Sequence, residues 1–483
     1  MAGVVPTPTG SAPEAAVSRT AAHTRDERFR AFLPSRPWQW LLVPFCAVMA
    51  LAVAEHAAVS MQQSGPSRVT RPDAARFAVA ENLVDADFQG ALHRADSDLS
   101  WARNRVRNAP GQWLKQESLA TAQMQRFSLT HDYAALAEAG KLLDDAHANA
   151  PAGSGPWLRQ ASFAMMTHDL SLAEAALDGA GAMAVPPPAS DRAEMTAMRG
   201  DIALYRGDMA TASARYTEAA RTDPTRSFAF RGAMLSRARG DFDSAIALFA
   251  RAARESASSR EARARIALQI GVSENARGHG ESAQEWYDAA ETLFPGSPIT
   301  MAHRAEALAL AGDMAAGMAL MEQVAQDHGW PEAMDALAMM HRFSGDRAQS
   351  LQWADRAAAI WGQRLRQAPL AAQAHAAEHE LAFGDPARAL ALARANLAVR
   401  QDGASRLLMA NALIANGRYA HARRELQLAV DAGWRSAPIY AAMSQAAALA
   451  GDKDGAANAR ERALAINPAI FNPETALAWF SHG

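Results

Sequence analysis

The sequence predicts an all-α protein in which short helices form an extended array instead of separate globular domains. Alanine is abundant, aromatic residues make up only 7% of the 483 residues, and β-branched residues are sparse. This composition favours closely packed helices over strands. The length alone would suit about three ordinary domains. A short motif, however, recurs along most of the chain at the spacing of paired helices, which favours a repeat array.

The N-terminal region predicts a tail followed by a membrane anchor. Residues 1–36 are polar and interrupted by prolines, which is typical of a disordered tail. Residues Pro37–Ala54 carry no charge and are about as long as a membrane-spanning helix. Trp38 and Trp40 lie at the start of this stretch, where indoles favour the membrane interface. We therefore predict a transmembrane helix over residues 37–56.

Arginines on either side of this segment predict its orientation. Five precede it and two follow it: Arg19, Arg25, Arg28, Arg30 and Arg36, then Arg68 and Arg71. The positive-inside rule then places the N-terminus in the cytoplasm and the rest of the chain on the exported side. Two alternatives are a signal peptide cleaved after Ala54 and a buried globular helix.

A linker and a capping helix are predicted next. Residues 57–73 contain Gly, Ser and two prolines, a composition typical of a linker. A helical stretch follows over about 74–108, and we expect the region 74–111 to cap the array. Repeat arrays need such ends because each unit leaves apolar surface bare.

The repeated motif is a Gly-Asp pair or a near-equivalent. It begins at His131, His168, Gly207, Gly240, Gly278, Gly312, Gly345, Gly384, Gly417 and Gly451. The first and last are 320 residues apart over nine intervals, a mean of about 36. This is a length typical of helical hairpins, and it predicts about ten of them over residues 112–467.

The third unit, Met198–Pro224, explains the pattern. Gly207 can adopt the left-handed backbone that ends a helix, and Asp208 can cap the next helix through its carboxylate. Ala212, Tyr216 and Ala219 then share one face of that second helix, and Pro224 prevents its continuation.

The fifth position after each motif is small in nine of ten units, which allows two helices to approach closely. Its occupants are Leu136, Ala173, Ala212, Ala245, Ala283, Gly317, Ser350, Ala389, Ala422 and Ala456. With the larger residue four positions later, a further Ala and a terminal Pro, the pattern resembles the tetratricopeptide repeat. The resemblance covers about residues 112–468. It is weaker in the first two units, where His replaces Gly, and around Gly384.

The resemblance implies antiparallel helix pairs stacked into a right-handed superhelix, with the first helix of each pair lining a concave groove. Transferring that register nominates Tyr205, Arg237, Asn275, Glu306, Arg342, Phe343, Glu378 and Asn411 as groove residues. Aromatic, amide and isolated charged groups suit an extended peptide or helix of a protein partner. For Tyr205 and Phe343 the alternative is packing against the next hairpin.

The C-terminal residues 468–483 are predicted to form a short helix. Its apolar side chains, Phe471, Leu477, Trp479 and Phe480, would cover the last hairpin.

Composition excludes several classes of function. The formal charge is −3, from 48 basic and 51 acidic residues. It provides no positive electrostatic field that would attract a polyanion, so we expect no nucleic acid partner. The single cysteine, Cys46, cannot form an internal disulfide or a thiolate zinc cluster. We expect no cofactor.

One stretch spells a metal motif. His375, Glu378 and His379 form H-x-x-E-H, in which two imidazoles on a helix can chelate zinc. The turn at Gly384 places the motif in the last two turns of a first helix, on the groove wall. Because a zinc hydrolase also needs a third ligand and a closed cleft, we interpret these residues as groove surface and predict no metal site and no enzymatic activity.

The sequence therefore predicts a single-pass, inner-membrane scaffold whose repeat domain binds proteins. The Ala- and Arg-rich usage is typical of high-GC bacteria, which would make the exported side periplasmic and suggest a role in envelope or polysaccharide assembly. Two alternatives remain. One is a zinc-dependent hydrolase that uses the H-x-x-E-H stretch. The other is a soluble tetratricopeptide co-chaperone, for which residues 38–54 must be buried.

Overall fold

The computed structural model describes residues 72–79, 87–255 and 259–480. All of them belong to the second of two compact units, Thr70–Gly483. The predicted tail (1–36), the anchor (37–56) and residues 57–71 of the linker lie outside the described residues. Among the described residues, no helix is both long enough and apolar enough to span a membrane.

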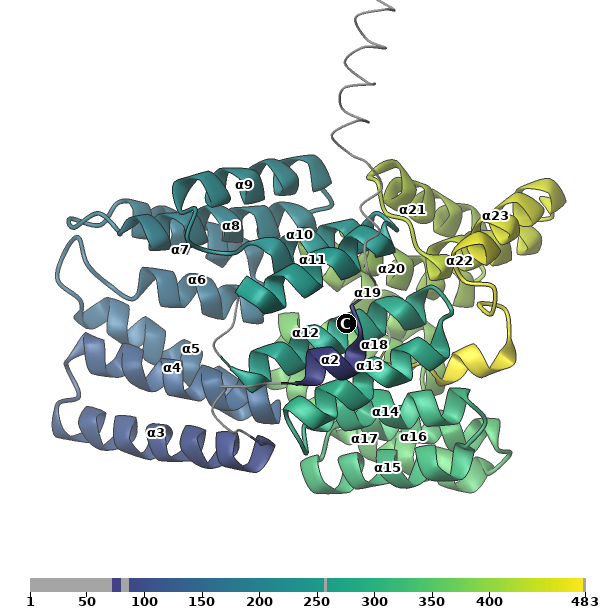
Figure 1. Cartoon of the computed structure of the whole chain (residues 1–483), viewed down its shortest axis with the longest axis horizontal. Helices are drawn as coiled ribbons and strands as arrows, with labels where there is room; N and C mark the ends of the chain where they lie inside the picture. Colours follow the sequence, from purple (N-terminus) through teal and green to yellow (C-terminus); the bar gives the residue numbers. More distant parts are fainter. Residues whose placement is uncertain (1–71, 80–86, 256–258, 481–483) are drawn as a thin grey trace, which may run out of the picture. The chain divides into compact units, whose positions relative to one another are not determined.

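Every regular element in the described ranges is a helix, so the all-α prediction is confirmed. Ten helix pairs follow one another, and consecutive pairs contact each other, as α4 to α9 show in Figure 1. The pairs are α4 (Trp113–Thr130) with α5 (Tyr133–Asn149), α6 (Trp157–Met166) with α7 (Leu170–Gly181), α8 (Ala189–Tyr205) with α9 (Met209–Thr222), α10 (Ala229–Ala238) with α11 (Phe242–Glu255), α12 (Arg260–Ala276) with α13 (Gly280–Leu293), α14 (Pro298–Leu310) with α15 (Met314–His328), α16 (Pro331–Phe343) with α17 (Arg347–Gln367), α18 (Pro369–Phe383) with α19 (Pro386–Val399), α20 (Gly403–Ala415) with α21 (Tyr419–Asp431), and α22 (Ala437–Leu449) with α23 (Lys453–Ile466). We number these hairpins one to ten.

The turn inside each hairpin follows from its sequence. Gly207 has φ 83° and ends the first helix of hairpin three, while the carboxylate of Asp208 accepts a hydrogen bond of 2.9 Å from the backbone N–H of Thr211. In hairpins one and two the same left-handed position is held by His131 (φ 53°) and His168 (φ 60°). These are the only residues other than glycine with positive φ among those described.

The small residues do pack as the pattern predicts. Ala212, Ala245 and Ala389 are fully buried. The opposite helix contributes a second small residue in two hairpins, because a Cβ on Gly200 or Gly271 would lie 2.5 Å from the ring of Tyr216 or Tyr287. The tyrosine ring therefore occupies the space that the glycine leaves, and the two helices of the hairpin approach closely.

The long interval before Gly384 is absorbed by one helix. α17 has 21 residues, against 14 in α9 and α11. Its additional turns bury Trp361 beneath the following hairpin.

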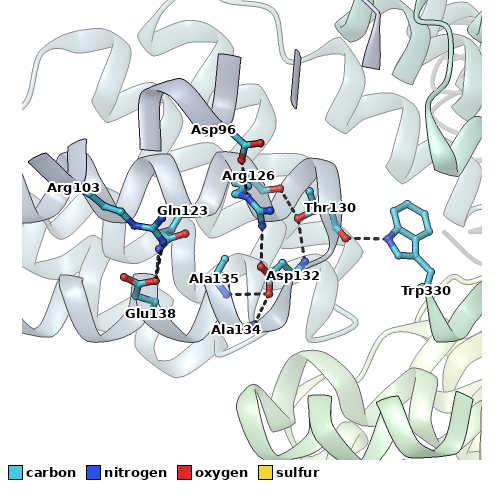
Figure 2. Close-up of polar contacts among 10 residues, drawn as sticks. All are labelled: Asp96, Arg103, Gln123, Arg126, Thr130, Asp132, Ala134, Ala135, Glu138 and Trp330. Atoms are coloured by element: carbon cyan, nitrogen blue, oxygen red, sulfur yellow. Dashed lines mark hydrogen bonds and ion pairs between the residues drawn. The ribbon is translucent and has the colours of Figure 1, made fainter. Parts of the chain in front are cut away.

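Hairpins that are distant in sequence also contact each other. The indole N–H of Trp330 donates to the carbonyl of Thr130 at 3.0 Å, as Figure 2 shows, and the ring of His131 stacks on Trp330 with centroids 4.1 Å apart. Two backbone hydrogen bonds also join distant hairpins. One runs from Gln401 N–H to Tyr205 O at 2.7 Å, and the other from Arg435 N–H to Ala238 O at 2.9 Å.

Each of these contacts joins the turn of one hairpin to the loop that follows the hairpin five places later. We call this series the seam. Its last member is the turn of hairpin five, where a Cβ on Gly278 would lie 2.6 Å from the side-chain oxygen of Asn467. By contrast, the turn glycines Gly312, Gly345 and Gly417 would meet no atom within 4 Å, so the turns of these later hairpins are uncovered.

The N-terminal part of the unit consists of two separate helices where one capping helix was predicted over 74–108. α3 (Phe88–Asn108) packs on α4, and Arg126 of α4 pairs with Asp96 of α3 at 2.9 Å (Figure 2). α2 (Ala74–Ala78) instead packs on α13, where Phe77 meets Trp286 edge to face at 5.2 Å.

The seam predicts different costs for two similar substitutions. Gly207→Ala and Gly417→Ala both force alanine into positive φ, which costs about 1–2 kcal/mol. In Gly207→Ala the new Cβ would also lie 2.9 Å from the carbonyl oxygen of Gln401, so the hydrogen bond from Gln401 to Tyr205 should weaken, at a further cost of about 1 kcal/mol.

The measurements are urea unfolding and hydrogen exchange at the Gln401 amide. We expect faster exchange at Gln401 in Gly207→Ala and unchanged exchange in Gly417→Ala. Equal effects of the two substitutions on both measurements would contradict a seam at this position.

Candidate binding groove

In hairpins eight to ten the first helices contact each other directly. α18 contacts α20, and α20 contacts α22, although a second helix separates each pair in sequence. Such direct contacts arise where curvature brings one set of helices together. All eight nominated groove residues belong to first helices, between α8 and α20.

Three of the nominated residues line one cavity. Asn275, Phe343 and Asn411 surround a space of about 1260 Å³. Its walls come from the turns of hairpins five to seven, from α20 and α22, and from the residues after α23. Hairpins five places apart thus face each other across it, as a consequence of the seam.

The wall of this cavity is apolar with several amides. The amides are Asn275, Asn411, Gln445, Asn467 and Asn472, and the larger apolar residues are Leu310, Met314, Phe343, Leu407, Ile470 and Phe471. Glu474 is the one charged residue among the described residues that line it. Amide side chains donate and accept hydrogen bonds, which matches the needs of a peptide main chain.

Two nominated residues are engaged by other parts of the chain. Glu306 is 3% exposed, and its carboxylate accepts the backbone N–H of Phe480 at 2.7 Å. Arg342 donates to the carbonyl of Ala382 at 2.8 Å and lies over the ring of Phe383 at 4.4 Å.

Two more nominated residues lie among the earlier hairpins. The ring of Tyr205 lies between His168, at 5.5 Å, and the guanidinium of Arg400, at 4.9 Å, and burial raises the pKa of its hydroxyl. Arg237 donates to the side-chain oxygen of Gln269 at 2.7 Å, and burial lowers the pKa of Arg237 to about 10. Tyr205 therefore packs at the seam, against hairpin two and the loop after hairpin eight, and not against the next hairpin, which was the alternative considered for it.

The H-x-x-E-H residues have two different environments. His375 pairs with Glu378, which is also one of the nominated groove residues, at 3.0 Å. Although burial acts to lower it, hydrogen bonding to Glu378 raises the pKa of His375. His379 is 4% exposed and its Nδ1 lies 2.7 Å from the carboxylate of Asp335.

For His379, this burial corrects the prediction that the whole motif lies on the groove surface. Asp335 of α16 is fully buried and also accepts the indole N–H of Trp361 at 2.8 Å, so His379 belongs to a polar cluster between hairpins seven and eight. Burial raises the pKa of Asp335, against the lowering effect of His379. The described residues contain no group of three or more side chains arranged to hold a metal ion.

Several residues of the cavity were absent from the sequence-based nomination. Leu407 and Gln445 come from helices of hairpins nine and ten, and Ile470, Phe471 and Asn472 come from the segment after the last hairpin. Transferring the same positions from one hairpin to the next cannot identify these residues. Which residues of distant hairpins face each other depends on the seam, and not on the position within a hairpin. Asn467 and Pro468, directly after the last hairpin, were the available signal for a bend in the chain.

A search against protein-family models gives no match, and none of the curated proteins matches. Among solved structures, the chain is similar to the human IFIT1 dimer with m7Gppp-AAAA, at 12% identity over 82% of this chain and 99% of that one, with a TM-score of 0.39. It is similar to a tetratricopeptide repeat protein from Parabacteroides merdae, at 14% identity over 53% and 98% of the two chains, with a TM-score of 0.31. Pseudomonas aeruginosa pilF follows at 17% identity, over 46% and 97%, with a TM-score of 0.26. Because these scores are below 0.5, the tetratricopeptide-like fold is assigned from the hairpins themselves.

The two histidines of the motif should respond differently to substitution. His379→Ala leaves the buried carboxylate of Asp335 without its imidazole partner, so we expect a loss of about 3 kcal/mol in the free energy of unfolding. His375→Ala breaks a pair that is about one-third exposed, and we expect a loss below about 1 kcal/mol.

Urea unfolding measures both losses, and metal analysis of the purified proteins supplies the control. Stoichiometric zinc in the unmodified protein, lost in both variants, would contradict the structural role of His379 and restore the hydrolase alternative.

Proposed function

We propose that this chain is a scaffold that binds an extended, uncharged segment of a partner protein in the cavity lined by Asn275, Phe343 and Asn411. The observation that supports the proposal is the wall of that cavity, with amides distributed over an apolar surface. Amides can hold a main chain by hydrogen bonds while apolar patches accept side chains. At about 1260 Å³, the cavity exceeds the usual volume of about 300–1,000 Å³ for small-molecule pockets.

The charge of the cavity argues against a nucleic acid ligand. Among the described residues, its lining contains no Lys, Arg or His, and the whole chain has a formal charge of −3. Binding to phosphates depends on basic side chains. A protein segment without strong charge is therefore the better match.

The proposal includes a location. We propose that residues 37–56 anchor the chain in the inner membrane, with the N-terminus cytoplasmic and the repeats periplasmic, where the partner would act in envelope or polysaccharide assembly. The support comes from the uncharged segment and from the arginine asymmetry around it, which follows the positive-inside rule.

Substitution of cavity residues should remove partner binding. Proteins retained by the immobilised chain should be lost from a Phe343→Ala/Asn411→Ala variant, because both side chains line the cavity. Phe230→Ala is the matched control, since Phe230 is 39% exposed and Phe343 is 43% exposed, and Phe230 lies outside the cavity wall.

The measurement is quantitative mass spectrometry of the retained proteins after cross-linking in cells. If the double variant retains its partners as well as the unmodified chain does, the cavity is not the binding site. If no protein is specifically retained, the proposal is also contradicted.

The topology proposal predicts a protease pattern. Protease added to intact spheroplasts should digest the repeats but leave a cytoplasmic marker protein whole, and the undigested chain should stay with membranes after carbonate extraction. Protection of the repeats from protease, or release of the chain by carbonate, would overturn the proposed location.

A further inference from the structure

The segment after the last hairpin, Asn467–Phe480, has an unusual path. We call it the C-terminal segment. Phe471 remains near the last hairpin, under the guanidinium of Arg460 at 4.0 Å. The chain then forms a 3-10 helix, η2 (Pro473–Leu477), which packs on α14 and α16 of hairpins six and seven. The segment was predicted to cover the last hairpin, but most of its apolar side chains contact earlier ones.

The end of the segment is held by apolar side chains and by a buried hydrogen bond. Leu477 and Phe480 belong to the apolar core of hairpins six and seven, and Trp479 packs beside it. The backbone N–H of Phe480 donates to Glu306 at 2.7 Å. The Phe480 ring lies 5.9 Å from His303 of α14, and Trp479 lies 6.0 Å from Phe383 of α18.

This end of the C-terminal segment therefore crosses the first helices of three successive hairpins, α14, α16 and α18. Those helices form the surface that the repeat register nominates for a partner, and Glu306 is one of the nominated residues. A carboxylate that accepts a backbone N–H can hold any peptide main chain, while the sites of Leu477 and Phe480 select apolar side chains. The chain's own segment thus uses the contacts that a bound peptide would use.

The segment is packed on one side only. Ile470, Asn472 and Ala478 border the cavity described above, and the residues Asn472–Glu474 are exposed. A five-residue 3-10 helix has little regular structure of its own to hold it in place. An incoming peptide could enter from the cavity side and displace the segment stepwise.

We propose that the C-terminal segment is an internal ligand of the groove, which a partner segment of the same chemistry replaces. The partner would present leucine and phenylalanine three residues apart, with the phenylalanine N–H bonded to Glu306. This inference rests on the proposed function and extends it from the cavity to the neighbouring groove surface around Glu306, because the C-terminal segment borders the cavity.

The test uses a synthetic fluorescent peptide with the sequence of residues 473–483. Its binding is measured by fluorescence anisotropy to the full-length chain and to a version that ends at Asn472. We expect the shortened version to bind the peptide at least about tenfold more tightly, because its groove is vacant. A peptide carrying Phe480→Ala should bind at least about tenfold more weakly than the unmodified peptide.

Variants of the shortened chain locate the site. Glu306→Gln should weaken peptide binding by about tenfold, because a charge-assisted hydrogen bond is replaced by a neutral one. Phe230→Ala, at an exposed ring that does not line the cavity, should leave the affinity unchanged. Circular dichroism shows whether the shortened chain is folded.

If the shortened chain does not fold, the full-length Phe480→Ala variant replaces it, and it should bind the unmodified peptide more tightly than the unmodified chain does. A folded acceptor that fails to bind the peptide would overturn the inference, and so would equal affinity for the full-length and shortened chains. Dimers of the full-length chain that disappear on shortening would assign the segment to a second copy and also overturn it.

The two proposals fail separately. If Phe343→Ala/Asn411→Ala loses its partners but no acceptor binds the peptide, the scaffold function stands and the internal ligand falls. If the peptide binds, and the shortened chain retains more partner than the full-length chain does, competition between the C-terminal segment and the partner is supported. Unchanged partner retention after shortening would overturn the competition.

Discussion

The seam between hairpins five places apart is the constraint on which the rest of the unit depends. In a simple repeat array each hairpin contacts only its neighbours. Here the hydrogen bonds from Trp330 to Thr130 and from Gln401 to Tyr205 add a second, long-range set. The seam brings α20 and α22 opposite the turns of hairpins five to seven, and Asn411 and Asn275 then line the same cavity. Without the seam these two side chains would belong to unrelated parts of the array.

The features that depend on one hairpin could be predicted from the sequence. Gly207 ends its helix, Asp208 caps the next, and Ala212 is buried where the pattern requires a small residue. Each of these features involves residues a few positions apart, whose spacing encodes their contact. The helical class, the number of hairpins and the position of their turns follow from the same local rules.

The environment of the groove residues could not be predicted in this way. Glu306 and Asn411 occupy equivalent register positions, yet Glu306 is buried under Phe480 and Asn411 is exposed at the cavity. Their difference arises from the seam. The position of the seam depends on the small rotations between many successive hairpins, and the sequence of a single hairpin does not encode their total. Departures from the repeat gave a partial signal, since His131 replaces glycine at the position where its ring stacks on Trp330.

The seam also determines where the C-terminal segment goes. Asn467 begins that segment at the last seam contact, beside Gly278, and its side-chain oxygen accepts the N–H of Ala469 at 2.9 Å. Asn467 is 8% exposed, so the chain leaves α23 from a fixed point opposite hairpin five. From there, hairpins six and seven are the next apolar surface that Leu477 and Phe480 can reach. The winding that creates the cavity therefore also brings the C-terminal segment to hairpins six and seven beside it, so that the cavity and the position of this segment depend on the same contact.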